Sequence, residues 1–277
     1  MKDSTLLKLD YLSILEINGK GSFDLLQGQI TADVNKVSDN NCVVGAMCDI
    51  KGRVISSFVV IKNFTKDDGF MLIGNKDSLK ILNEALIKFV PFYKTQLRLN
   101  DQIEISAIKE ATLLRDFPEA DLSKTSQTLD NFQRVHYLNK DFHLLIAEEI
   151  SAFGAYEIVE KPNLWKLDEI KQHNFEISSS TTGIFTAHEL GYDKSKRIDF
   201  EKGCYTGQEV VARMQYRAKK LPKLLCRESK NTYEVMSKIY NDLEKQIGTV
   251  LSSAKSENTN HYLLSMNKNY QNEDFEF

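Results

Sequence analysis

Residues 202–209, which read KGCYTGQE, contain the cysteine of this chain whose surroundings most suggest chemistry. Cys204 follows Lys202 by two residues and lies between Gly203 and Gly207. A thiol near a cation and near the start of a helix ionises more readily, and the thiolate is its reactive form. Glycines this close together predict a backbone approach that a side chain would block. The residues alone leave two interpretations open: a reactive thiol beside Lys202, or a buried cysteine at a tight turn.

The elements that must position this motif predict a mixed fold. Strands are expected at 11–17, 42–49, 53–62, 70–73, 96–99, 103–108, 135–138, 142–146, 247–251 and 262–266, and helices at 22–28, 76–89, 164–172 and 207–216. Ser22 is the expected cap of the first helix, and Pro91 is expected to terminate the second. Turns are expected at Lys51-Gly52, 67–69 and 139–141, and the polar segment 119–133 predicts a surface loop or short helix. Without a regular β-α-β alternation, this pattern favours an α+β fold.

Composition excludes several classes of protein. The chain has 277 residues, a hydrophobic fraction of 42% and a net charge of −3, so it can bury an ample core and exerts no overall attraction for nucleic acid or membrane. Residues 1–10 lack the basic and apolar pattern of a leader, and no apolar stretch approaches the ~20 residues of a membrane span. We therefore expect a cytoplasmic protein.

The four cysteines do not form a metal-binding pattern. Cys42, Cys48, Cys204 and Cys226 include no CxxC pair and no zinc-ribbon spacing. A resident iron–sulfur cluster normally requires four grouped thiolates. We therefore predict no metal site, and scattered cysteines are typical of a reducing compartment.

Three motifs, in order along the chain, resemble those of the YgfZ family of folate-binding proteins, relatives of the glycine-cleavage T-protein. They are LQGQITADV at 26–34, CDIKGR at 48–53, and KGCYTGQE at 202–209 with its continuation VVAR at 210–213. The resemblance implies a T-protein-like α+β body over residues 1–220, with two subdomains, and a short C-terminal β-barrel over 221–277. It also implies binding of tetrahydrofolate or another folate, and a role in assembly or repair of iron–sulfur enzymes, including those of tRNA modification.

The resemblance also implies site residues. Cys204 would be the essential thiol, with Lys202 beside it, and Trp165 matches a tryptophan that lines the family's folate pocket. Leu12 takes the place of a second pocket aromatic, with Tyr11 adjacent to it. The remaining implied folate contacts are Gln29, Asp33, Tyr205, Gln208, Glu209 and Arg213. A polar loop such as the one that holds Gln29 and Asp33 is equally common without a ligand.

Two departures from the T-protein pattern bear on catalysis. The Asp-Asp pair of T-proteins is replaced here by Ser56-Ser57, which removes the acid–base group of aminomethyl transfer. The glutamate-alanine-glycine segment after the pocket tryptophan is replaced by residues 171–173, and Glu169 is out of register by two residues. The chain therefore lacks a complete transferase site by sequence.

A basic run follows the cysteine motif, with no acidic residue between Val210 and Arg227. Its members are Arg213, Arg217, Lys219, Lys220 and Lys223. Such a run is usually a solvated helix face. The functional alternative is an anion site for the glutamate tail of a folate or for a phosphate. Stable nucleic-acid binding is not expected, because the run is short and has few interleaved aromatics.

The sequence therefore supports one leading hypothesis and two alternatives. The first is a tetrahydrofolate-binding accessory protein that serves iron–sulfur enzymes or their assembly proteins through Cys204. The second is a folate-dependent aminomethyl or one-carbon transferase. The third is an RNA-associated protein that uses the basic run.

Overall fold

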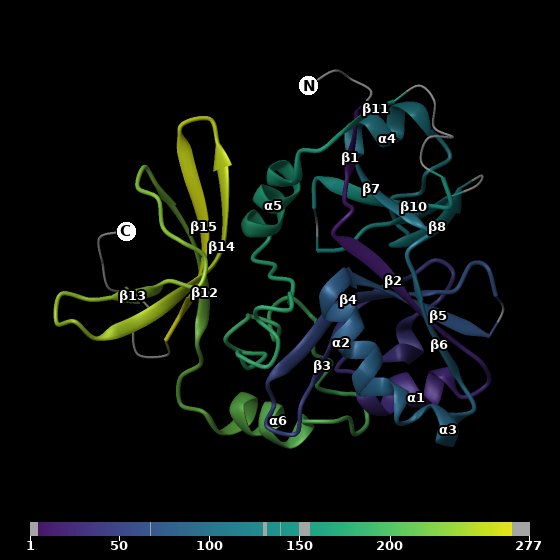
Figure 1. Cartoon of the computed structure of the whole chain (residues 1–277), viewed down its shortest axis with the longest axis horizontal. Helices are drawn as coiled ribbons and strands as arrows, with labels where there is room; N and C mark the ends of the chain where they lie inside the picture. Colours follow the sequence, from purple (N-terminus) through teal and green to yellow (C-terminus); the bar gives the residue numbers. More distant parts are fainter. Residues whose placement is uncertain (1–4, 67, 130–131, 139, 150–155, 268–277) are drawn as a thin grey trace.

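The computed structural model describes residues 5–66, 68–129, 132–138, 140–149 and 156–267 (Figure 1). Residues 67 and 139, which belong to two of the expected turns, lie outside this part. No helix among these residues is long and apolar enough to cross a membrane. Within the described residues, the element order mixes fifteen strands with short helices and confirms the α+β class.

A five-stranded antiparallel sheet forms the first layer. Its strand order is β3-β4-β5-β2-β6, with β2 (Leu12–Asn18), β3 (Val43–Cys48), β4 (Val54–Lys62), β5 (Gly69–Asn75) and β6 (Gln96–Asn100). One face of it is covered by helices α1 (Ser22–Gln29), α2 (Lys76–Ile87) and α3 (Val90–Tyr93). Leu79, Leu82 and Leu86 recur with helical spacing on α2 and are fully buried against this face. The first sheet therefore has one helix-covered side and one side free for a second layer.

A six-stranded sheet packs on that free side. Its strand order is β11-β1-β7-β10-β9-β8, with β1 (Thr5–Lys8), β7 (Glu104–Lys109), β8 (Ser126–Leu129), β9 (Phe132–Val135), β10 (Phe142–Ala147) and β11 (Glu157–Val159). Helix α4 (Glu110–Asp116) follows β7 directly. Alternate residues of both sheets meet in one apolar core, in which Ile14 and Ile73 of the first sheet join Leu144 and Ile146 of the second.

The last part of the chain adds two helices, a long irregular segment and a third sheet. Helix α5 (Pro162–Lys171) lies between the second sheet and the third, and α6 (Gln208–Arg217) follows the irregular segment (Figure 1). The third sheet has the order β12-β15-β14-β13, with β12 (Lys223–Ser229), β13 (Lys238–Tyr240), β14 (Gln246–Ser256) and β15 (Thr259–Met266). Its residues Leu251 and Leu263 pack with Ile170 and Tyr192 of the preceding segment.

The expected C-terminal β-barrel is instead an open four-stranded sheet. Closure of a barrel requires the first and last strands of the sheet to pair, and β12 and β13 lie at opposite edges. The expected domain boundary after residue 220 stays a prediction.

Most expected elements form within a few residues of their predicted limits, with two informative exceptions. The segment 119–133 was expected to be a loop or short helix, but it contains β8 and the start of β9. The hydrophobic pattern does not predict this hairpin, because some of its buried positions hold polar residues. Buried Gln133 donates to the Ser126 hydroxyl at 2.6 Å. At α1, Gly21 rather than Ser22 occupies the cap position, and the Ser22 hydroxyl donates to the Gly19 carbonyl at 2.6 Å.

One buried cation joins the irregular segment to the first sheet. Arg197 is fully buried, and its guanidinium donates to the carbonyl oxygens of Gly45 and Phe58 at 3.2 and 3.0 Å. It also donates twice to the side-chain oxygen of Asn174, at 3.2 and 3.0 Å. These bonds connect β3 and β4 to residues more than a hundred positions later, so they fix the route of the chain toward the cysteine motif.

The two glycines of the motif have different roles. Gly207 precedes α6 with φ +83°, and a Cβ there would lie 2.4 Å from the carbonyl oxygen of Asp49 in the β3–β4 turn. The expected close backbone approach is therefore confirmed at Gly207. At Gly203, an added Cβ would meet nothing within 4 Å, so the expectation is wrong there.

This contrast predicts opposite results for two alanine substitutions. Gly207→Ala should lower the free energy of unfolding by about 3 kcal/mol, because it forces a left-handed alanine against the Asp49 carbonyl. Gly203→Ala should change it by less than about 0.5 kcal/mol. Urea unfolding monitored by circular dichroism measures both, and equal effects would contradict the proposed packing of Gly207.

Replacement of the buried arginine should also destabilise the fold. Arg197→Met leaves three buried oxygen acceptors without their donor, which should cost about 3 kcal/mol. Arg98→Met is the matched control, since Arg98 is exposed and should cost less than about 0.5 kcal/mol. A wild-type urea midpoint for the Arg197 variant would show that the guanidinium does not hold the segment.

Candidate functional site

The loop before α6 is fastened to the end of α1 by Lys202. The side chain of Lys202 is buried, and its ammonium donates to the carbonyl oxygens of Gln27, Ile30 and Ala32 at 2.8, 2.7 and 2.9 Å. Burial lowers the pKa of Lys202 to about 8, against the opposing effects of the Asp33 and Asp199 carboxylates. All three ammonium protons are used by main-chain oxygens, so Lys202 serves the loop as an anchor.

The thiol of Cys204 is exposed in this loop. It makes no hydrogen bond to any residue that the structure describes, and it precedes Gly207, the N-cap of α6, by three residues. The alternative of a buried cysteine at a tight turn is therefore wrong. The other three cysteines are more enclosed, and burial raises the pKa of Cys42 and Cys226 to about 11 and that of Cys48 to about 12.

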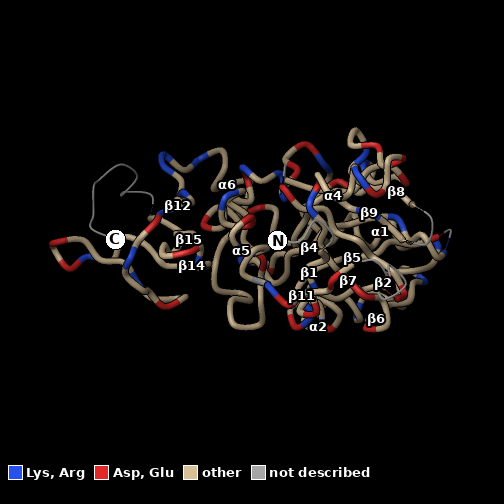
Figure 2. Tube along the Cα trace, turned by 90° about the horizontal axis from the view of Figure 1, so that it is seen from above, with Lys and Arg blue, Asp and Glu red and all other residues tan. Residues whose placement is uncertain are grey.

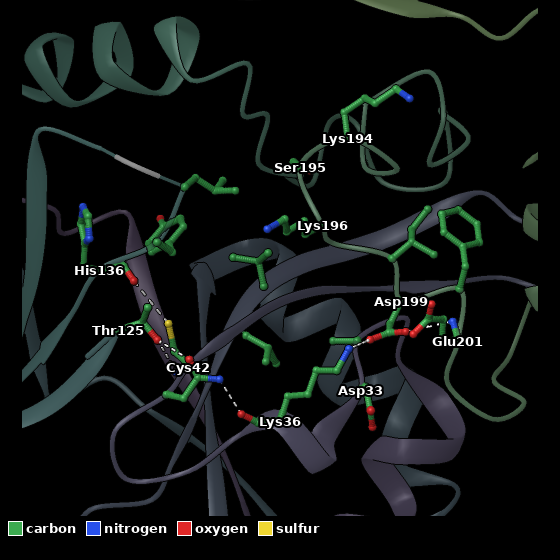
Figure 3. Close-up of a pocket in the computed structure, with 18 of the residues that line it drawn as sticks. Asp33, Lys36, Cys42, Thr125, His136, Lys194, Ser195, Lys196, Asp199 and Glu201 are labelled. Carbon is green, nitrogen blue, oxygen red and sulfur yellow. Dashed lines mark hydrogen bonds and ion pairs between the residues drawn. The ribbon is translucent and has the colours of Figure 1, made fainter. Parts of the chain in front are cut away.

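A cavity of about 840 Å³ adjoins the motif loop (Figure 3). Its wall combines the start of β3, the Thr125 region, the end of β9 and the segment 194–201. Asp199 and Glu201, immediately before the motif, belong to this wall, whereas Cys204 does not. The cavity wall therefore joins segments near the first and second sheets to the residues that immediately precede the motif.

The polar groups of the cavity are only partly satisfied by one another. Lys36 and Asp199 of the wall form an ion pair with each other, while Lys196 points into the cavity and has no ion-pair partner among the described residues (Figure 3). The buried hydroxyl of Ser195 also lacks a hydrogen-bond partner there. Free donors on a concave wall are what a polar ligand would use. Sequence reasoning missed both residues, because a lysine-rich surface turn carries no distinctive motif.

Asp33 lies on the cavity wall, and its implied contact with a folate stays a prediction. Its side chain accepts hydrogen bonds from Gln27 at 2.9 Å and from the Asn35 backbone at 3.1 Å. Burial alone would raise the pKa of Asp33, but these hydrogen bonds outweigh burial and lower it below its usual value. The carboxylate therefore stays charged and caps the short turn Val34–Lys36.

Trp165, the implied pocket aromatic, does not line this cavity. It is fully buried in the core between the two large sheets, together with Leu12 and, at the edge, Tyr11. The Lys140 ammonium lies 3.9 Å from the Trp165 ring centre and 4.0 Å from that of Tyr137, and it pairs with Glu169. A ligand would have to displace this lysine to stack on Trp165. Tyr137, in contrast, lies on the cavity wall.

Burial sets the charge state of this enclosed group. It lowers the pKa of Lys140 and raises that of Asp168, because both charged forms lose their hydration. The indole nitrogen of Trp165 has no hydrogen-bond partner among the described residues.

The remaining implied folate contacts divide between the loop and the outer face of α6. Gln29 is buried and accepts a hydrogen bond from Thr206 at 2.9 Å, and Tyr205 is buried beside Lys202. Gln208 begins α6, while Glu209 and Arg213 are exposed on it and border a shallow surface hollow. These residues do not line the 840 Å³ cavity, and their role in binding stays a prediction.

Ser56 and Ser57 occupy structural positions. Both are buried, the Ser56 hydroxyl lies 2.6 Å from that of Ser78, and the Ser57 hydroxyl accepts from the Ile177 backbone at 2.9 Å. No carboxylate replaces the T-protein acids at these two positions. The strand therefore uses its hydroxyls to hold α2 and the irregular segment in place.

The structure brings one cysteine near a histidine, but the pair is not built for nucleophilic catalysis. The Cys226 thiol lies 3.4 Å from Nε2 of His173 and donates to the Ile170 carbonyl at 2.8 Å. Burial raises the pKa of Cys226, which disfavours the reactive thiolate. His188 instead contacts Gln215 at 3.0 Å.

One cluster has the residue types of a metal site, but the ring proton of its buried histidine lies on the nitrogen that would have to bind the metal. Glu110, His136 and His143 could place ligand atoms within 4.8 Å of one another. Burial, together with the charges of His136 and Arg134, lowers the pKa of His143 to about 3, so the ring is neutral. Arg134 lies 3.0 Å from Nδ1 of His143, and because a guanidinium can only donate, the ring proton belongs to Nε2. That proton faces Glu110 at 3.2 Å and blocks ligation through Nε2.

No family model matches the chain. Curated relatives do match: the tRNA-modifying protein YgfZ of Colwellia psychrerythraea is 29% identical over 258 residues, which cover 90% of this chain and 78% of the relative. The protein of the same name from Pectobacterium carotovorum is 27% identical over 273 residues, covering 92% and 80%.

A solved structure agrees with these sequence matches at the level of fold. Glycine cleavage system aminomethyltransferase T from Bartonella henselae superimposes with a TM-score of 0.71 over 95% of this chain and 78% of that chain, at 12% identity. The chain is therefore a homologue of the YgfZ proteins and has the fold of the glycine-cleavage aminomethyltransferase.

Proposed function

We propose that this chain binds tetrahydrofolate in the 840 Å³ cavity and supports the assembly or repair of iron–sulfur enzymes, including those that modify tRNA, through the thiol of Cys204. The observation that carries the proposal is an exposed thiol in a rigidly anchored loop, next to a cavity wall formed by the same segment. The name of the relatives, tRNA-modifying protein, supports a role related to tRNA modification.

The cavity suits a folate in size and polarity. Its volume of about 840 Å³ lies in the range of small-molecule sites. A folate combines a flat pterin that donates N–H groups with a glutamate end that carries carboxylates. Asp33 and Glu201 are acceptors for the former, Lys196 is a donor for the latter, and Tyr137 and Phe200 supply aromatic surface. The ligand contacts proposed here replace the stacking on Trp165 that the resemblance implied.

The thiol is separate from the folate cavity wall, which favours an accessory role. Cys204 is exposed at the surface, where a cluster, a sulfur carrier or another thiol of a client protein can reach it. Its anchor is independent of the client, because Lys202 holds the loop through main-chain oxygens.

The alternative of a one-carbon transferase has less support. The hydroxyls of Ser56 and Ser57 are used in structural hydrogen bonds, so this strand offers no group for proton transfer to the folate amine. Incubation with tetrahydrofolate and an aminomethyl donor should therefore give no transfer above the uncatalysed rate.

Removal of the thiol should abolish function without affecting the fold. Cys204→Ala should keep the wild-type unfolding midpoint, because the side chain is exposed, and should fail to restore iron–sulfur enzyme activity in cells that lack the protein. Cys226→Ala is the matched control and should restore it. Full rescue by the Cys204 variant would remove the thiol from the mechanism.

Loss of the free cation in the cavity should weaken folate binding. Lys196→Ala should raise the dissociation constant for tetrahydrofolate about tenfold, since a charge-assisted hydrogen bond to a carboxylate is lost. Lys166→Ala, on the exposed face of α5, should leave it unchanged. Isothermal titration calorimetry under anaerobic conditions measures both. Equal affinities for the wild type and both variants would place the folate elsewhere.

A further inference from the structure

A separate cavity, of about 250 Å³, lies where the chain passes between the two large sheets. This inter-sheet cavity is bounded by the segment 8–13, which joins β1 to β2, and by the segment 101–106, which joins β6 to β7. Both segments cross from one sheet to the other, because β1 and β7 belong to the six-stranded sheet and β2 and β6 to the five-stranded one (Figure 1). The inter-sheet cavity shares no lining residue with the 840 Å³ cavity.

Hydrogen bonds within and between these two segments hold the walls of the inter-sheet cavity in place. The Leu9 N–H donates to the Ile105 carbonyl at 3.1 Å, and the Leu12 N–H donates to the Leu9 carbonyl at 3.0 Å. The Ser13 hydroxyl donates to Oδ1 of Asp101 at 3.0 Å. None of these bonds requires a ligand, so the cavity is already formed in the protein, as small-molecule sites usually are.

The buried part of the wall is aliphatic and contains one unpaired hydroxyl. Its aliphatic residues are Leu9, Leu12, Ile103 and Ile105. Ser106 belongs to the same wall and is fully buried, and its hydroxyl has no hydrogen-bond partner among the described residues. A buried hydroxyl without a partner is unfavourable, and a polar atom of a ligand would satisfy it. The interior of the cavity therefore favours a ligand that is partly aliphatic and partly polar.

Charges of both signs surround this aliphatic part. The charged residues of the wall are Lys8, Asp10, Lys76, Asp101 and Glu104. Figure 2 shows basic and acidic residues close together near the labels of β11 and α2, the elements to which the lining residues Ile158 and Lys76 belong.

Two of these charges lie next to each other and keep free hydrogen-bonding capacity. The Lys76 ammonium lies 3.2 Å from Oδ1 of Asp101, which leaves other ammonium protons available. Both contacts that the described residues make with the Asp101 carboxylate use Oδ1, so Oδ2 can accept from a ligand. The Ser13 hydrogen bond, together with Lys76, lowers the pKa of Asp101, so this carboxylate is charged at neutral pH.

We propose that the inter-sheet cavity binds an α-amino acid with a branched aliphatic side chain, of which L-leucine is the probe. The ammonium and carboxylate of an α-amino acid are attached to one carbon, so its opposite charges are close together, as are those of Lys76 and Asp101. The ligand ammonium donates to Oδ2 of Asp101, and the ligand carboxylate accepts from Lys76. The aliphatic side chain packs against Leu12 and Ile103. A bound amino acid thus links both segments that connect the sheets.

Other classes of small molecule fit the inter-sheet cavity less well. A folate or a nucleotide needs more room than about 250 Å³, and no aromatic residue lines this wall to stack on a ring. A simple anion would meet the carboxylates of Asp10, Asp101 and Glu104 against only two lysines. A purely apolar molecule would leave the Ser106 hydroxyl unpaired. A zwitterion with an aliphatic part meets all three conditions.

Isothermal titration calorimetry with L-leucine tests the inference. Lys76→Gln should raise the dissociation constant about fivefold, because the ligand carboxylate loses a partly exposed charge pair. Asp101→Asn should have a similar effect through the ligand ammonium. Lys80→Gln, one turn later on α2, removes the same charge from an exposed position outside the cavity and should leave the affinity unchanged. The Lys76 and Asp101 variants should keep the wild-type urea midpoint, since both side chains are partly exposed.

Two analogues of L-leucine test the need for both charges. The analogue without the ammonium is 4-methylpentanoate, and the analogue without the carboxylate is 3-methylbutylamine. Each should bind about tenfold more weakly than L-leucine, because one charged hydrogen bond is lost and its protein partner is left unpaired. Affinity of either analogue equal to that of L-leucine would overturn the zwitterion site.

Two further outcomes would also overturn the inference. One is the absence of binding up to about 10 mM L-leucine, since a specific site should give a dissociation constant below this range. The other is binding that Lys76→Gln and Asp101→Asn both leave unchanged, which would place the amino acid outside the inter-sheet cavity. The inference is independent of the proposed function: the Lys76 variant should bind tetrahydrofolate like the wild type, because Lys76 does not line the 840 Å³ cavity.

Discussion

Two buried cations that donate to main-chain carbonyls hold the functional part of this molecule in place. Arg197 binds the carbonyls of β3 and β4, and Lys202 binds those at the end of α1. Neither has a carboxylate among these partners, so each depends on several neutral oxygens at fixed positions. Between them, Asp199 and its neighbours are confined to one path, which forms the cavity wall and leads to Cys204. The irregular segment is therefore fixed without belonging to a helix or a sheet.

This anchoring keeps the exposed thiol of Cys204 and part of the cavity wall on one continuous segment of the chain. Buried cations are costly to desolvate, and that cost shows in the lowered pKa of Lys202. The cost is offset because the carbonyls at the end of α1 would otherwise lack donors. The arrangement leaves the thiol of Cys204 free, because Lys202 is used entirely for structure.

The comparison with the T-protein fold separates shape from chemistry. The fold is shared over nearly the whole chain. In this chain Ser56 and Ser57 are buried in structural hydrogen bonds, and Trp165 is covered by Lys140. What the structure leaves accessible is a polar cavity and the exposed thiol of Cys204.

The sequence by itself determined the α+β class, most strands and helices, and the motif around Cys204, because apolar periodicity and glycine positions are local signals. For the basic run it left two readings open, a solvated helix face and an anion site. Only the tertiary structure decided that Lys202 is an anchor, that Trp165 lies inside the core, and that the C-terminal strands form an open sheet. It also revealed Lys196 and Ser195 on the cavity wall. These features arise from contacts between residues distant in sequence, such as Lys202 with Gln27. A local sequence pattern does not show which distant segment will pack against a given side chain.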